Sequence, residues 1–376
     1  MTEQAVRKPL KESALNSERI ARIADEIHAA VPGFDPAAFT TDVMADLPRL
    51  ELKARIDRTA RALHEHLPYT GPAALQALLA SLPSSPEAAG VGNDFGLHTY
   101  SPYSRYVARY HCNDAELDQA LDALVVFTRY FSAEDAVRTF LNAYPDQTLA
   151  AVRAWAGSED YRVRRLASES TRPVLPWSER ITLPPTTGLP ILELLHRDET
   201  RFVAASVANH LRDISATDPE LVLSTLARWK QQGQGAGQFD FISRDALRNQ
   251  VKSGNAAAFD FLGFPSPAPV AVSPLTIIPE RPRVGDSLTF TAKLSVTVPA
   301  PLHIMYVITP VSPDRRRREK AYFLRRLSLS PDAPAHLEKA HPLRASGTAA
   351  VRPGPYELLL QVNGVRYPPA AFHVHE

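Results

Sequence analysis

The feature that most constrains the fold of this chain is an internal repeat with a period near 40 residues. Three helix-like segments resemble one another: YRVRRLASES, RFVAASVANH and ISRDALRNQ. Val163 lies 40 residues before Val203, and Ala205 lies 41 residues before Ala246. Each copy follows another helix-like segment, namely TLAAVRAWAG, LPILELLHRD and ELVLSTLARW. Paired helices at this period are typical of HEAT-like repeats, which stack into a solenoid with their second helices on one surface, normally the concave one.

The chain before these repeats also has a helical pattern. The segment ERIARIADEIHAAV spaces its three isoleucines three and four residues apart, which predicts a buried helix face. Asp35-Pro36 predicts a capped helix start with proline at the first helical position. In SAED, Ser132 and Asp135 fit a capping box at the start of another helix. We therefore expect residues 1–264 to form an all-α, HEAT-like repeat domain.

The last 112 residues have a different pattern and hold 17 of the 33 prolines. The segment FPSPAPVAVSP predicts a stiff linker over residues 265–274, because proline restricts its own φ and the residue before it. SLTFTAKLSVTV and YELLLQV alternate apolar and other residues, and Asn363-Gly364 predicts a hairpin. Tyr356, just before its strand, fits a tyrosine corner. We therefore expect residues 275–376 to form a small, all-β immunoglobulin-like sandwich.

The distribution of charge divides the chain at the same place. Residues 265–376 contain 14 Lys+Arg and 8 Asp+Glu, a balance of +6, which leaves 28 basic and 33 acidic residues for residues 1–264. A basic module beside a mildly acidic one indicates a polyanionic partner. The single cysteine, Cys112, excludes an intrachain disulfide, and neither a signal-like segment nor an apolar run of about 18 residues is present. These features predict a cytoplasmic protein.

The segment RRLASESTRPVLPW, Arg164–Trp177, carries the residues of greatest chemical interest. In a helix, Arg165, Glu169 and Arg172 lie on one face at i, i+4 and i+7. A proline then ends the helix, and a second proline stiffens the turn that carries Trp177. Spacing alone is compatible with a salt-bridged helix end and a packed tryptophan. The alternative is a carboxylate that is kept there for chemistry.

The neighbouring helices add polar residues at related places on the same surface. These residues are Asn209, Arg212, Asp213, Arg244, Arg248 and, upstream, Glu134. Arginines on a concave surface suit phosphates, through bidentate contacts and counterion release. Carboxylates beside these arginines weaken the binding of a polyanion. Their presence therefore predicts a positive charge in the ligand. An alkylated base has such a charge, and so does the oxocarbenium sugar that forms when its glycosidic bond breaks.

Three blocks in order carry a family resemblance: YRVRRLASESTRPVLPW, VAASVANHLRDI and SRDALRNQVKSGNAAAFDFLGF. They resemble the HEAT-like alkylpurine DNA glycosylases of the AlkC/AlkD superfamily. The (V)RRLxSExTRPxLPW and ANxLxDI patterns are similar to AlkC, and the resemblance covers roughly residues 10–264. A C-terminal immunoglobulin-like domain resembles one branch of the AlkC group. The resemblance implies removal of cationic N3-methylated bases from DNA, chiefly 3-methyladenine and in some members 3-methylcytosine.

The resemblance also implies roles for individual residues. Glu169 and Glu134 would be the acidic residues of the active site, and Asp213 matches the aspartate of the ANxLxDI block. Trp177 would contact the lesion or its nucleotide, and Arg165 would hold the DNA backbone. One departure is HLR at positions 210–212, where the family pattern has Asn-Leu-Asn, and it leaves the role of Arg212 open.

The implied chemistry needs no strong acid, because an N3-methylated adenine departs as a neutral base. A carboxylate can stabilise the sugar cation and aim a water at its anomeric carbon. An aromatic face such as Trp177 attracts the base while the base is cationic. No lysine stands among the matched residues, so we expect a monofunctional hydrolase without a Schiff-base lyase step. The sequence leaves open whether the base is flipped or the duplex is kinked.

The run DRRRREK in the β region predicts either a solvated loop or a clamp on DNA phosphates. We prefer the clamp because of the neighbouring DNA-binding domain. Its predicted DNA-binding residues are Arg315, Arg316, Arg317, Arg318 and Lys320, with help from Arg325 and Arg326.

The sequence thus predicts a two-domain DNA repair glycosylase that acts on double-stranded DNA containing alkylated bases. We expect a monomer that needs no cofactor and no metal, in the cytoplasm and at the nucleoid while it acts. The alternatives are a HEAT scaffold that binds a protein or peptide, and a DNA-binding member of the family without catalysis. The lesion range, the carboxylate that positions water and the oligomeric state remain open.

Overall fold

The computed structural model of the chain describes residues 9–233, 236–311, 319–347 and 350–376. Contacts divide the chain into two compact units. Unit 1 extends to Ile214 and includes residues 236–242, whereas unit 2 contains residues 215–233 and the chain from Ser243 onward. None of the helices in the described part of the chain combines the length and the apolarity that a membrane span requires.

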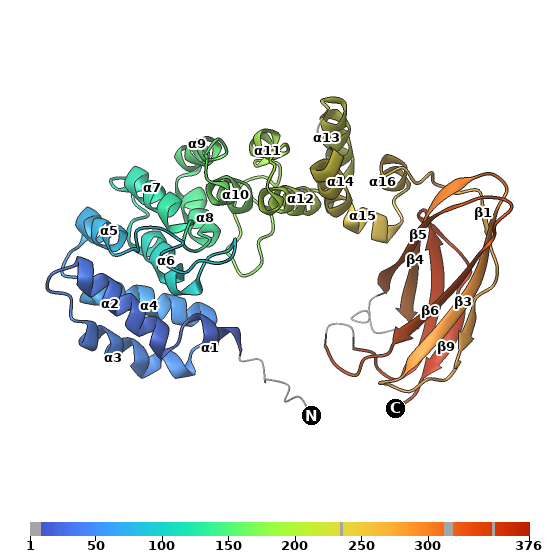
Figure 1. Cartoon of the computed structure of the whole chain (residues 1–376), viewed down its shortest axis with the longest axis horizontal. Helices are drawn as coiled ribbons and strands as arrows, with labels where there is room; N and C mark the ends of the chain where they lie inside the picture. Colours follow the sequence, from blue (N-terminus) through green and yellow to red (C-terminus); the bar gives the residue numbers. More distant parts are fainter. Residues whose placement is uncertain (1–8, 234–235, 312–318, 348–349) are drawn as a thin grey trace. The chain divides into compact units, whose positions relative to one another are not determined.

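Unit 1 is helical (Figure 1). Its helices are α1 (Leu10–Ala14), α2 (Ser17–Ala30), α3 (Pro36–Asp46), α4 (Leu52–His66), α5 (Gly71–Ala80), α6 (Ser101–Tyr110), α7 (Leu117–Phe127), α8 (Glu134–Ala143), α9 (Pro145–Trp155), α10 (Tyr161–Ser170), α11 (Leu189–Leu195) and α12 (Arg201–Ser215). Two 3₁₀ turns, Leu47–Arg49 and His98–Tyr100, precede α4 and α6.

The helices of unit 1 form two rows, as the repeat pattern predicts. Figure 1 shows α5, α7, α9 and α11 along one side and α6, α8, α10 and α12 along the other. The apolar positions that recur in the repeats are fully buried, as at Val163 and Leu166 in α10 and Val203 and Val207 in α12. The helix pairs α9–α10 and α11–α12 coincide with pairs read from the sequence, so the helical solenoid prediction is confirmed.

The helix caps predicted from the sequence are present at some helix starts and absent at others. The Asp35 side chain accepts hydrogen bonds from the backbone N–H groups of Ala37 and Ala38, so the predicted cap of α3 is confirmed. The predicted capping box at Ser132 is wrong, because α8 begins at Glu134 without a side-chain cap. The Ser132 hydroxyl instead donates to the Glu134 carboxylate. The same hydroxyl accepts a hydrogen bond from Arg165 of α10, so a tertiary contact replaces the helix cap at this position.

Unit 2 combines short helices with two antiparallel sheets. Its helical elements are α13 (Pro219–Gln231), the end of α14 (Ala236–Ala246), α15 (Arg248–Ser253) and α16 (Ala256–Phe261). Its strands are β1 (Val270–Val272), β2 (Thr276–Ile278), β3 (Ser287–Val296), β4 (Ala300–Pro310), β5 (Lys320–Leu329), β6 (Ala335–Pro342), β7 (Gly354–Val362), β8 (Val365–Arg366) and β9 (Ala370–Val374).

The two sheets form the immunoglobulin-like sandwich. In one sheet, β1 and β2 pair with one edge of β3 and β6 pairs with the other, and the second sheet has β5, β4 and β7 in order, with β8 and β9 on the far edge of β7. Alternate residues such as Phe290 and Leu360 fill the core between them. The Tyr356 hydroxyl donates to the Arg352 carbonyl at 2.8 Å, which confirms the tyrosine corner. Asn363 and Gly364 adopt positive φ in the β7–β8 turn, which confirms the hairpin.

One expectation about the junction needs correction. The segment ISRDALRNQ is not one helix, because the backbone at Leu247 (φ −90°, ψ 5°) separates α14 from α15. Consequently Arg244 and Arg248 do not share a helix face. The stretch expected to be a linker contains β1, which pairs with β3. The domain boundaries at residues 264 and 274 remain a prediction.

Candidate active site

The predicted Arg–Glu–Arg face exists at the end of α10, and its carboxylate is enclosed. Glu169 is only 4% exposed. Arg172 Nη1 lies 2.5 Å from Glu169 Oε1, and Arg165 Nη2 lies 3.7 Å from the same oxygen. On the other side, the Ser206 hydroxyl of α12 donates to Glu169 Oε2 at 2.5 Å. Helical spacing supplies the two arginines, and the next repeat supplies the hydroxyl.

The surroundings of Glu169 hold it in the ionised form. Burial alone would raise the pKa of this carboxyl, but the charges of Arg165 and Arg172 and the hydrogen bond from Ser206 outweigh it. The result is a pKa below the ordinary value for glutamate. A buried carboxylate is therefore available as a negative charge at neutral pH.

Arg165 links Glu169 to the second predicted acid. Its guanidinium lies over the ring of Phe202 at 4.5 Å and that of Phe95 at 5.2 Å. Its Nη1 donates to the Ser132 hydroxyl at 2.6 Å and lies 3.4 Å from Glu134 Oε2. The two carboxylates thus share one buried arginine, and Glu134 is the more exposed of the two.

Arg172 links Glu169 to the third predicted acid. Its Nε lies 3.0 Å from Asp213 Oδ2 of α12. Asp213 also accepts a hydrogen bond from the backbone of Val174. Burial raises the pKa of Asp213, although Arg172 opposes that effect. We call the set Glu134, Arg165, Glu169, Arg172 and Asp213 the carboxylate site.

Trp177 follows the carboxylate site on the loop after α10. Its side chain is 91% exposed, and its backbone has φ 70°, which is unusual for a residue other than glycine. Lys53 of α4 donates to the Trp177 carbonyl at 2.7 Å. The interpretation of Trp177 as a packed loop anchor is therefore wrong, because its indole is presented to solvent.

Comparison with known proteins identifies relatives of both parts of the chain. A family model described as "DNA alkylation repair enzyme" matches residues 128–249, and one described as "Uncharacterised protein YhaZ, C-terminal Ig-like domain" matches residues 271–376. The uncharacterised protein YhaZ of Bacillus subtilis (strain 168) is 31% identical over 311 residues, which cover 82% of this chain and 83% of that protein.

A solved structure decides the family. Pseudomonas fluorescens alkylpurine DNA glycosylase AlkC, bound to DNA containing an abasic site analogue, matches with a TM-score of 0.87 and 32% identity. The match covers 98% of this chain and 100% of that chain. The chain belongs to the AlkC family. The family resemblance of the three sequence blocks is thereby confirmed, and the match extends through the immunoglobulin-like domain.

The departure from the AlkC pattern lies directly behind Glu169. His210 is fully buried, with Nδ1 3.1 Å from the Ser168 carbonyl and Nε2 without a hydrogen-bond partner in the described residues. Burial, with the nearby charge of Arg172, lowers its pKa to about 3, so the ring is neutral. A Cβ on Gly188 would lie 2.2 Å from His210 Cε1, so this imidazole requires a glycine at its side.

The second departure in the same block is Arg212. Its Nη2 donates a hydrogen bond to Asn209 Oδ1 at 2.5 Å.

The remaining predicted DNA-binding residues of this AlkC-family chain belong to unit 2. Arg244 and Arg248 are exposed, and Arg248 Nη1 lies 3.7 Å from Asp245. Lys320 opens β5 and lines a hollow with Lys252. Arg315, Arg316, Arg317 and Arg318 lie outside the described residues.

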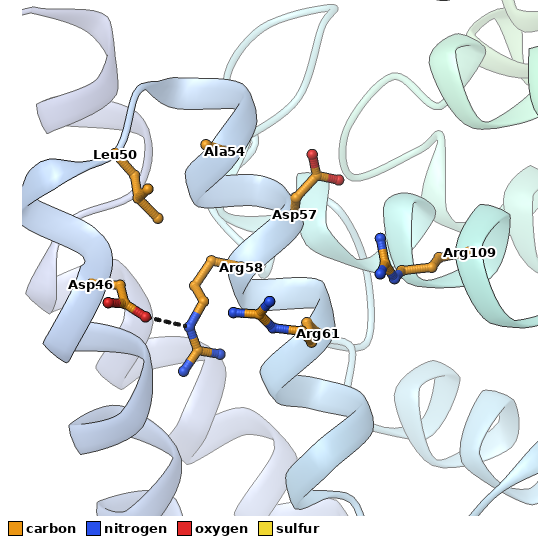
Figure 2. A pocket seen from close by; sticks show the side chains of 7 residues that line it. All are labelled: Asp46, Leu50, Ala54, Asp57, Arg58, Arg61 and Arg109. Atoms are coloured by element: carbon orange, nitrogen blue, oxygen red, sulfur yellow. Dashed lines mark hydrogen bonds and ion pairs between the residues drawn. The ribbon is translucent and has the colours of Figure 1, made fainter.

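A second arginine–carboxylate cluster lies on α3, α4 and α6 and contains none of the predicted site residues. We call it the arginine cleft; it has a volume of about 250 Å³ and is lined by Asp46, Leu50, Ala54, Asp57, Arg58, Arg61 and Arg109. Figure 2 shows Arg58 reaching Asp46, with Arg61 on the same helix and Arg109 on the neighbouring α6. The Arg58 Nε–Asp46 Oδ2 distance is 3.2 Å. Asp57 pairs with Arg105, so its carboxylate is also compensated.

Sequence reasoning missed several residues that shape the carboxylate site. They are Lys53, Phe95, Arg138, Ser168, Phe202 and Ser206. A lone hydroxyl within the apolar run VAASVA was a usable signal for Ser206, because a buried serine needs a partner. The others have no local signature, because their contacts join helices far apart in the sequence.

Proposed function

We propose that this chain hydrolyses the N-glycosidic bond of cationic N3-alkylated bases in double-stranded DNA. The observation that carries the proposal is the buried, ionised Glu169, held between two arginines. Membership of the AlkC family supports the reaction class, and the P. fluorescens enzyme was solved with DNA containing an abasic site analogue. The substrate that we propose is 3-methyladenine, with 3-methylcytosine as a further candidate.

The net charge of the carboxylate site favours a cation. Three carboxylates and two guanidiniums give −1 when all five groups are ionised. A charge that develops on the sugar as the C1′–N bond breaks is attracted to this site. The leaving base takes the bonding electron pair and becomes neutral, so no proton donor is needed. Water supplies the hydroxyl at C1′, and a carboxylate takes its proton.

The different exposure of the carboxylates suggests a separate catalytic role for each. Glu134 is partly exposed and is the acid that we propose to contact the attacking water, with Ser132 and Arg165 fixing its position. Glu169 is enclosed and supplies fixed negative charge. The indole of Trp177 offers an open π face, which attracts a cationic base before bond cleavage and releases it afterwards.

We also propose that the enzyme is monofunctional. Lys53 contacts the Trp177 loop: its amine donates to the Trp177 carbonyl and lies 3.9 Å from Asp135. Both contacts engage this amine, so it is not presented as a nucleophile for attack on C1′. Borohydride should therefore trap no covalent enzyme–DNA adduct. A trapped adduct would contradict hydrolysis by water alone.

The deciding experiment measures free base released from methylated duplex DNA by the purified full chain. We expect release of 3-methyladenine and formation of abasic sites in equal amounts. Binding of duplex DNA without release would instead make this chain a non-catalytic member of its family. We propose that it acts as a monomer in the cytoplasm, which sedimentation of the enzyme–DNA complex and cell fractionation would test.

A further inference from the structure

The loop after α10 holds its tryptophan in a conformation that needs support. We call residues 171–180 the Trp loop. Trp177 combines a positive φ with an almost fully exposed side chain, so neither backbone preference nor burial of the indole stabilises its position. The neighbouring Val174 is also exposed. Contacts elsewhere in the protein must therefore fix this segment.

Arg138 of α8 provides the first of these contacts. It is fully buried and donates to the carbonyls of Glu179 at 2.6 Å, Arg172 at 2.8 Å and Ser170 at 3.3 Å. It makes no ion pair with any residue in the described part of the chain, and burial lowers its pKa. A buried guanidinium is stable only if carbonyl oxygens or carboxylates solvate it. Here the carbonyls at the two ends of the Trp loop accept from Nε and Nη1, whereas Nη2 has no hydrogen-bond partner in the described residues.

Two further contacts act inside the loop. Asp213 accepts from the Val174 backbone N–H, near the middle of the segment. Lys53 then donates to the carbonyl of Trp177 itself, across 124 positions of sequence. Its ammonium also lies 3.9 Å from Asp135, which directs the flexible side chain towards the loop. The carbonyl that Lys53 holds belongs to the residue with the unusual backbone.

We propose that Lys53 and Arg138 are positioning residues that hold the Trp loop in place, so that the Trp177 indole stands ready for the cationic base. This inference rests on the proposed function. A loop fixed before binding loses little freedom when DNA arrives, and the aromatic face meets the lesion in one orientation. Neither residue is needed to touch the reacting atoms.

Lys53 is the better residue to test, because it is half-exposed and its replacement leaves the core intact. Lys11 offers a matched control: it is also a surface lysine in an ion pair, with Glu51 at the start of α4. Lys53→Ala and Lys11→Ala remove the same charge, so a general effect of charge on DNA binding appears in both. Lys53→Arg keeps a donor for the Trp177 carbonyl and should restore most of the rate.

The first measurement is the single-turnover rate of base release in a double-mutant cycle with Trp177→Ala. We expect Lys53→Ala to slow release about 10-fold in the wild-type background and to have little effect in the Trp177→Ala background. Lys11→Ala should have little effect in either background. If Lys53→Ala slowed release equally in both backgrounds, or flattened the salt dependence of binding, Lys53 would be a direct phosphate contact and the proposal would be wrong.

The second measurement does not depend on catalysis. Trp155 and Trp229 are 8% and 0% exposed, so acrylamide quenches mainly Trp177. The quenchable part of the tryptophan anisotropy decay should gain a fast component in Lys53→Ala and not in Lys11→Ala. Unchanged decay in both variants would overturn the positioning role even if wild-type enzyme releases base. A changed decay in an enzyme that releases no base would instead refute the proposed function alone.

Discussion

Unit 1 contains two arginine–carboxylate clusters with inverted arrangements. In the arginine cleft, the buried group is Arg58, and its partners Asp42, Asp46 and Glu65 are each at least one-third exposed. In the carboxylate site, the buried group is Glu169 and arginines surround it. The first arrangement joins helices and leaves its acids in water.

The second arrangement encloses a negative charge and requires two buried arginines and a serine to keep it ionised. Enclosing a carboxylate costs more desolvation than leaving it at the surface. A protein that only needed to join α10 to α12 would do so with the simpler arrangement. We therefore propose that the arginine cleft serves stability, whereas the carboxylate site serves chemistry.

The largest expected effect is loss of base release in Glu169→Gln. The amide keeps the shape of the side chain but removes the charge that stabilises the sugar cation, so we expect the single-turnover rate to fall about 10²–10³-fold. Binding of undamaged duplex should change little. Asp46→Asn, the matched change in the arginine cleft, should leave the rate within about 2-fold of wild type, because its carboxylate lies at the exposed rim. Equal losses in both variants would remove the distinction between the clusters.

Arg58→Met should show the opposite pattern. Removal of the buried guanidinium takes away its packing and its hydrogen bonds to partly exposed acids, and we expect a loss of about 2 kcal/mol in the free energy of unfolding. Release by the folded fraction should proceed at the wild-type rate. Denaturant titration measures the free energy of unfolding, and single-turnover assays at low temperature measure the rate of release by the folded fraction. Arg61→Met, a half-exposed neighbour, should cost less than about 1 kcal/mol.

A smaller effect is expected on the free energy of unfolding when the pH is lowered. It comes from His210, the histidine behind Glu169. The pKa of His210 falls from about 6.5 in the unfolded chain to about 3 in the folded protein. The unfolded state therefore binds more protons below pH 6.5, so this contribution is complete above that pH and decreases as pH falls towards 3. It should amount to about 2 kcal/mol lost between pH 7 and pH 5.

Urea titration across that range checks the prediction. His210→Asn should reduce the pH dependence between pH 7 and pH 5 by about 2 kcal/mol, and the remaining dependence includes His303 and His341, whose pKa values burial lowers to about 4. His336→Asn, at an exposed position on β6, serves as the control and should leave the dependence as in wild type. The same slope in His210→Asn and wild type would mean that another group is responsible.

The residues that the sequence could predict are those whose geometry a single helix determines. Arg165, Glu169 and Arg172 follow from i, i+4 and i+7 spacing, and the repeat period places α10 and α12 side by side. The tyrosine corner and the Asn363-Gly364 turn are likewise local. In these places the sequence and the structure agree.

The residues that the sequence could not predict depend on contacts between distant elements. Ser206 meets Glu169 from the next repeat, and Phe95 stacks on Arg165 from a loop 70 residues upstream. Lys53 reaches Trp177 from α4. Ser132 fits a helix cap by its spacing, but a tertiary contact with Arg165 and Glu134 determines its role. Spacing carries no information about such contacts.

The most direct test of the central claim uses two duplexes that carry abasic analogues of similar shape and different charge. One contains a protonated pyrrolidine in place of the sugar, and the other contains a neutral tetrahydrofuran. If the enclosed carboxylate exists to stabilise a sugar cation, wild-type enzyme should bind the pyrrolidine duplex at least about 10-fold more tightly, and Glu169→Gln should lose that preference. Equal affinity of wild-type enzyme for the two duplexes, or an undiminished preference in Glu169→Gln, would contradict this account of the carboxylate site.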